Sequence, residues 1–82
     1  MDIFSLGIIL YQMSHNLRHP FGENYIEYGM KYQNNYEIDN LVVDFDNSIE
    51  DKDFKDLLTK MLKINPKNRL NWKEYFYHPF FD

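Results

Sequence analysis

The feature that most constrains the fold of this chain is a nearly unbroken apolar segment at its beginning. Residues Asp2 to Asn16, DIFSLGIILYQMSHN, read as a helix with apolar side chains on almost every side, and Asp2 is placed to cap its first turn. A helix of this kind normally lies inside a larger protein. In a chain of only 82 residues, we therefore expect this helix to need neighbours that the chain does not supply.

Length and composition exclude several classes of protein. The 82 residues are enough for one small domain. The chain has no cysteine, which excludes disulfides and thiolate metal sites and is compatible with an intracellular, cytoplasmic location. Its net charge of -4 and its lack of a basic cluster argue against a nucleic-acid partner. The run from Ile3 to Met13 is too short to cross a membrane and lacks the basic start of a secretory signal.

Three further helices are predicted along the chain. The segment from Glu23 to Gln33 follows a connector and has only a loose apolar stripe. The segment from Ile49 to Lys63 has the clearest helical period, and the segment from Trp72 to Tyr77 is a short final helix. The strong stripe of the third helix consists of Phe54, Leu57, Leu58, Met61 and Leu62.

Capping residues and prolines mark the ends of these helices. Ser48 with Asp51 resembles a capping box, and Asn71 with Glu74 makes a second one. Pro66 ends the third helix, and the His78-Pro79 pair closes the fourth. The segment from Asn34 to Asn47 is expected to be a loop with its apolar residues turned inward, because a short strand from Leu41 to Phe45 would lack a partner.

Four short motifs, in this order, resemble the later part of a eukaryotic protein kinase catalytic domain. Asp2-Ile3-Phe4-Ser5-Leu6-Gly7 looks like the D-x-[WF]-S-x-G motif of helix F, and Pro20-Phe21 looks like the P-F pair before helix G. Asn65-Pro66-Lys67-Asn68-Arg69 resembles [DN]-P-x-x-R after helix H, and His78-Pro79-Phe80-Phe81 resembles the H-P-[WF]-[FIL] end of the domain. Each motif is weak alone, but together they cover nearly the whole chain.

The resemblance implies an all-α fold of four helices, equivalent to the kinase C-lobe from helix F to helix I. Residues 1–82 would then be one partial kinase domain, comprising subdomains IX to XI. Because Met1 stands directly before the motif aspartate, we expect the chain to be truncated relative to a complete domain. The missing upstream kinase segment would be its first partner.

The resemblance also implies structural roles for four residues. Asp2 would accept hydrogen bonds from the catalytic loop, although an ordinary helix cap is the alternative. Ile9 and Met13 match positions that support the adenine pocket, with plain core as the alternative. Arg69 matches the arginine that pairs with the glutamate of the A-P-E motif. That motif does not occur here, so Arg69 is expected to find another carboxylate or, more readily, to lie at the surface.

Partner docking is a further implication of the family. The region of helix G often binds substrates or regulators, and exposed aromatic side chains would suit such a surface, with core packing as the alternative. The candidates are Phe21, Tyr25, Tyr28 and Tyr32. His15, His19 and His78 do not have the spacing of known metal ligands, so no metal site is expected.

The sequence contains none of the motifs that carry out phosphoryl transfer. A Gly-rich loop, a strand lysine, a catalytic-loop aspartate and a D-F-G are all absent. We therefore expect no catalytic, ATP or metal residue in this chain and no activity from it alone. A complete parent domain would use ATP and magnesium to phosphorylate Ser or Thr in proteins. The alternatives are a non-catalytic helical interaction module and a pseudokinase remnant.

Overall fold

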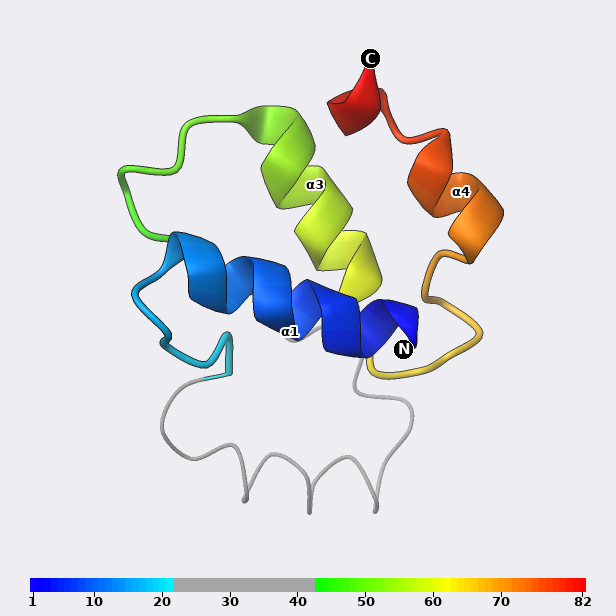
Figure 1. Ribbon diagram of the computed structural model, residues 1–82, viewed down its shortest axis with the longest axis horizontal. Helices are drawn as coiled ribbons and strands as arrows, with labels where there is room; N and C mark the ends of the chain where they lie inside the picture. Colours follow the sequence, from blue (N-terminus) through cyan, green and yellow to red (C-terminus); the bar gives the residue numbers. More distant parts are fainter. Residues whose placement is uncertain (22–42) are drawn as a thin grey trace.

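The computed structural model describes residues 1–21 and 43–82, and in this part of the chain it contains helices and no strand (Figure 1). The all-α prediction is therefore confirmed for these residues. Three α-helices are described where four were expected, and the predicted helix from Glu23 to Gln33 lies outside the described residues. The elements are α1 (Ile3–Ser14), α3 (Lys52–Met61), α4 (Trp72–Phe76) and the 3-10 helix η1 (Pro79–Phe81).

Helix α1 is capped as predicted but is shorter than the predicted segment. The Oδ1 atom of Asp2 accepts a hydrogen bond from the Ser5 N–H at 2.7 Å. The helix ends at Ser14, and the next residues turn away because Asn16 and Leu17 have φ angles of 54° and 65°. Left-handed residues of this kind stop a helix.

Helix α3 begins three residues later than predicted, because Asp51 itself is its cap. The Asp51 side chain accepts hydrogen bonds from the N–H groups of Asp53 and Phe54. The predicted capping box of Ser48 with Asp51 was wrong, since the Ser48 N–H donates instead to the carboxylate of Asp46. Asp46 thus takes the Ser48 N–H that the predicted capping box assigned to Asp51, and it forms a turn before the helix instead.

Helices α1 and α3 pack against each other (Figure 1). The buried core includes residues of both helices. The predicted stripe of α3 is confirmed, because Leu57, Leu58 and Met61 are completely buried. Gly7 of α1 sits directly on this stripe. A Cβ atom at Gly7 would lie 3.0 Å from Leu62 Cδ2 and 3.1 Å from Met61 Cβ, so the absence of a side chain lets the two helices approach closely.

The C-terminal end of the chain returns to α3. The capping box of Asn71 with Glu74 is confirmed at the start of α4, which ends at Phe76, one residue earlier than predicted. His78 then caps η1, and η1 packs against α3. In the loop before α3, residues 43–45 form no strand, while Val43 is buried and Phe45 is half-buried.

Candidate functional site

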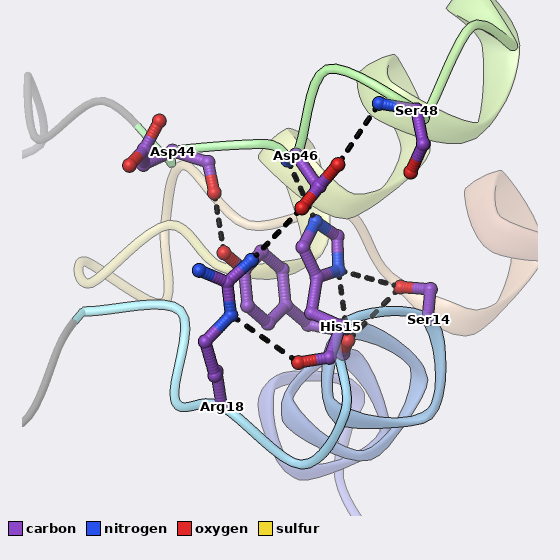
Figure 2. Close-up of polar contacts among 7 residues, drawn as sticks. Ser14, His15, Arg18, Asp44, Asp46 and Ser48 are labelled. Carbon is purple, nitrogen blue, oxygen red and sulfur yellow. Dashed lines mark hydrogen bonds and ion pairs between the residues drawn. The ribbon is translucent and has the colours of Figure 1, made fainter.

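The end of α1 is joined to the loop at 44–48 through a buried histidine (Figure 2). The His15 side chain is almost fully buried, and its ring stacks on Tyr11 with centroids 3.8 Å apart. Its Nδ1 lies 3.0 Å from the Tyr11 carbonyl oxygen, and its Nε2 accepts the Asp46 N–H at 3.0 Å. Because a carbonyl only accepts and an N–H only donates, these contacts place the ring proton on Nδ1.

Polar groups around His15 strengthen the same connection. The Tyr11 hydroxyl donates to the Asp44 carbonyl, and burial raises the pKa of Tyr11. Arg18 forms an exposed ion pair with Asp46 at 3.3 Å, as Figure 2 shows. Hydrogen bonding from Ser48 lowers the pKa of the Asp46 carboxyl, with a smaller contribution from the Arg18 charge. We call this set of contacts the His15 joint.

A second buried histidine joins the C-terminal end to α3. The Nδ1 atom of His78 accepts the Phe80 N–H at 3.1 Å, so its Nε2 carries the proton and lies 2.7 Å from Asp56 Oδ2. Lys60 reaches the same carboxylate oxygen at 2.9 Å. The hydrogen bond from His78, followed by that from Lys60, lowers the pKa of Asp56.

The two histidines that precede a proline share a local geometry that sequence reasoning missed. His19 Nδ1 accepts the Phe21 N–H at 3.2 Å, just as His78 Nδ1 accepts the Phe80 N–H. The signal was present as a repeated His-Pro-Phe, at 19–21 and at 78–80. In both cases the ring caps the turn that the proline begins. Burial lowers the pKa of His19.

Arg69 is held by backbone groups at the end of α3. Its Nε and Nη2 donate to the carbonyl oxygens of Lys63 at 3.0 Å and Ile64 at 3.1 Å, and its Cζ lies 4.9 Å from the centre of the Phe4 ring. The expectation of a surface arginine was wrong, since the residue is half-buried. Carbonyls just beyond a helix lack intrahelical partners, and Arg69 satisfies two of them.

The other three predicted structural residues take no part in the contacts of His15 or His78. Asp2 is exposed and caps α1, and the Ser5 N–H lowers its pKa, with a smaller contribution from the Arg69 charge. Ile9 is 39% exposed and Met13 is 75% exposed. In this chain neither one is core, which corrects that alternative. Helix α1 thus carries apolar side chains on a face that the described residues do not cover.

Comparisons with known proteins identify the family of this chain. The family model for the protein kinase domain matches residues 1–81. The chain belongs to the protein kinase domain family. It is 37% identical over 83 residues to a serine/threonine-protein kinase/endoribonuclease IRE1 of Hypocrea jecorina, covering 99% of this chain and 6% of that protein. It is 39% identical over 84 residues to a putative serine/threonine-protein kinase of Acanthamoeba polyphaga mimivirus, covering 98% and 17%.

A third relative of this kinase-family chain has a different description. It is a probable inactive serine/threonine-protein kinase of Dictyostelium discoideum, 35% identical over 85 residues and covering 98% of this chain and 10% of that protein. The kinase-family chain therefore spans less than a fifth of the length of each of these three relatives. No solved structure matches it at a comparable level of significance.

The remaining predicted residues of this kinase-family chain concern docking. Phe21 is half-buried, and its ring lies 6.3 Å from that of Phe4 at the start of α1. Tyr25, Tyr28 and Tyr32 lie outside the described residues. Phe21 is therefore a packing residue in this structure.

The contacts found among the described residues are structural ones. Within residues 1–21 and 43–82, no group of three or more acidic, histidine or cysteine side chains is arranged to hold a metal ion. No helix in the same part of the chain is both long enough and apolar enough to span a bilayer. The His15 joint ties the loop at 44–48 to the end of α1, His78 ties the C-terminal segment to α3, and Arg69 contacts the turn that follows α3.

Proposed function

We propose that this chain forms the lower part of the C-lobe of a Ser/Thr protein kinase, with α1 as helix F, α3 as helix H and α4 as helix I. The match over residues 1–81 and the names of the relatives support this proposal. The parent domain transfers the γ-phosphate of ATP, with magnesium, to Ser or Thr hydroxyls of proteins.

The observation that carries the proposal is the uneven surroundings of α1. One side of α1 packs closely on α3 through Gly7, while Ile9 and Met13 on the same helix stay exposed. A contact with the rest of a catalytic domain would cover these exposed side chains and remove apolar surface from water. This is the environment that helix F has in the family.

The chain by itself is proposed to be inactive. Its sequence lacks the Gly-rich loop, the D-F-G and the catalytic-loop residues, so ATP and magnesium bind to another part of the parent protein. In the parent, Asp2 accepts hydrogen bonds from the catalytic loop. Arg69 pairs with the glutamate of the A-P-E motif and so stabilises the activation segment. The region of helix G docks a protein substrate or regulator, and the parent acts inside the cell, in the cytoplasm.

A chimera tests this proposal. The chain is 38% identical over 80 residues to the serine/threonine-protein kinase ATG1b of Arabidopsis thaliana, so it can replace the matching segment of that host. We expect the chimera to keep ATP-dependent phosphorylation of a protein substrate. Asp2→Ala should abolish this activity, whereas Lys73→Gln at an exposed site of α4 should leave it unchanged. A chimera that folds and binds ATP but transfers no phosphate would contradict the proposal.

A second candidate is a catalytically inactive scaffold. The Dictyostelium relative, described as probably inactive, favours this possibility. The two candidates differ in the residues that precede helix F in the parent. Sequencing the transcript upstream of the codon for Met1 decides between them, because an active parent encodes H-R-D and D-F-G in frame and a scaffold lacks their aspartates.

A further inference from the structure

Ser48 is an exposed serine in the loop before α3. Acidic residues stand two and three positions after it, in the order Ser48-Ile49-Glu50-Asp51. A capping box does not explain this pattern, because Asp51 itself caps α3 and the Ser48 N–H donates to Asp46. The exposed serine with its two acidic neighbours therefore has no role in starting the helix.

The residues at 48–51 lie outside the helices, since α3 begins one residue later. The other Ser and Thr residues of the chain are Ser5, Ser14 and Thr59, and each of them lies within α1 or α3. An exposed loop lets an enzyme contact successive residues of the chain, which a helix packed on its neighbour does not allow. Ser48 is thus the hydroxyl that a modifying enzyme reaches most readily.

The two acidic residues after Ser48 are accessible as well. Glu50 and Asp51 are exposed, and neither forms an ion pair within residues 1–21 and 43–82. The helix cap uses only the Oδ1 atom of Asp51. Basic groups of an enzyme can therefore contact two carboxylates just beyond the hydroxyl, and charge patterns of this kind are one way in which kinases select their substrates.

The same serine belongs to the surroundings of the His15 joint (Figure 2). Its N–H donates to Asp46 Oδ1 at 2.9 Å, and Arg18 Nη2 lies 3.3 Å from Oδ2 of this carboxylate. Hydrogen bonds from the Ser48 N–H and then from its hydroxyl lower the pKa of Asp46. The Asp46 N–H in turn donates to His15. A new charge on the Ser48 oxygen would therefore act on the residue that ties α1 to the loop.

We propose that Ser48 is a phosphorylation site for an acid-directed protein kinase and that the phosphate loosens the His15 joint. The Ser48 oxygen bonds to the γ-phosphorus of ATP held by that kinase, the bond to ADP breaks, and the hydroxyl proton passes to the catalytic base of that kinase. The product places a charge of about -1.5 to -2 beside the Asp46 carboxylate, and like charges repel. Arg18 then pairs with the phosphate in preference to Asp46.

The inference goes beyond the proposed function and holds for an active or an inactive parent. The proposed function gives partners in the parent to Asp2, Ile9, Met13 and Arg69, and none of them belongs to this loop. The test uses the kinase chimera in its ATP-binding form, whether or not it transfers phosphate. If the chimera does not bind ATP, the parent protein made from its complete transcript takes its place.

The folded protein is incubated with ATP and casein kinase II, an acid-directed enzyme, and is then digested with trypsin. The tryptic peptide of residues 32–52 contains Ser48 as its only Ser or Thr, so its fragment masses identify the site. We expect one phosphate at Ser48. Absence of this phosphate, or its appearance without the added enzyme, would overturn the assignment of the site to an acid-directed kinase.

Two matched substitutions test how the site is recognised. Asp51→Asn removes one acidic charge but keeps a residue type that caps helices equally well, and it should lower kcat/KM for phosphorylation about tenfold. The control Asp53→Asn removes an exposed acidic charge in the first turn of α3 and should leave kcat/KM unchanged. Equal losses for both variants would overturn recognition through the residues that directly follow Ser48.

Hydrogen–deuterium exchange of residues 44–48 measures the effect on the His15 joint. We expect faster exchange after phosphorylation of Ser48, because the Asp46 N–H is then held less firmly by His15. With Asp46→Asn, which removes the like charge, phosphorylation should change the exchange much less. Unchanged exchange in the phosphorylated protein, or an equal change with Asp46→Asn, would overturn the effect of the phosphate on the joint.

Discussion

Helices α1 and α3 are packed against each other, but their surroundings differ. Helix α3 is amphipathic, and its apolar residues Leu57, Leu58 and Met61 are completely buried. Helix α1 has no charged residue between Ile3 and Ser14, and it buries mainly Ile3, Gly7 and Tyr11. Its other apolar residues are half-buried or exposed.

The difference lies in how far the described residues bury the apolar side chains of each helix. The described residues bury the apolar side of α3 in the core, and the polar side of α3 carries ion pairs. The described residues bury the apolar side chains of α1 on one side of the helix only. A helix with apolar side chains left in water is stabilised further when a neighbour covers them.

The largest expected effect contrasts the two helices directly. Leu58→Ala removes a fully buried side chain of α3 and should lower the free energy of unfolding by about 2–5 kcal/mol. Ile9→Ala on the exposed side of α1 should change it by less than about 0.5 kcal/mol. Urea unfolding measures both. A large loss for Ile9→Ala would mean that α1 is already covered in this chain.

The His15 joint gives the next effect. His15→Ala leaves the Asp46 N–H without its acceptor, so the free energy of unfolding should fall by about 1–3 kcal/mol. Arg18→Gln removes only the exposed ion pair with Asp46 and should cost less than about 1 kcal/mol. Thermal unfolding compares the two variants. Equal losses would show that the exposed pair, rather than the buried ring, ties α1 to the loop.

A substitution at Gly7 tests the close contact between α1 and α3. A methyl group there meets Met61 Cβ and Leu62 Cδ2, and the crowding costs about 1–3 kcal/mol. Alanine also favours the helix by about 1 kcal/mol. The net loss for Gly7→Ala should be about 1 kcal/mol in urea unfolding. A gain in stability would mean that the two helices separate easily.

The smallest effect concerns the polar side of α3. Hydrogen bonds from His78 and Lys60 lower the pKa of Asp56, so the folded carboxyl binds a proton less readily than the unfolded one. This contribution is complete above the ordinary pKa of about 3.9 and is lost as the pH falls below it. Asp56→Asn should therefore make the loss of stability in acid less steep.

The matched control for Asp56→Asn is Glu50→Gln, which removes an exposed carboxylate before α3. The urea midpoint measured from about pH 5 to about pH 2 follows the effect. An acid profile that Glu50→Gln flattens as much as Asp56→Asn would assign the pH dependence to general charge rather than to the contact with His78.

The parts of this structure that the sequence predicted are those set by local rules. The stripe of α3 and the cap formed by Asn71 with Glu74 follow from helical period and capping chemistry within a few residues. The contact of His15 with Asp46 spans 31 residues, and no local pattern indicates it. The burial of Arg69 was predicted wrongly because its partners are backbone carbonyls. Every residue has such a carbonyl, so the residue types in the sequence do not indicate this contact.

The central claim is that the outer side of α1 needs a neighbour, and dye binding to the 82-residue chain tests it most directly. We expect the chain to bind the apolar dye ANS, and Ile9→Lys with Met13→Lys should reduce this fluorescence while circular dichroism stays unchanged. The same double substitution should abolish activity in the kinase chimera. A chain that melts in one cooperative step without binding ANS would contradict the claim and favour a self-sufficient helical module.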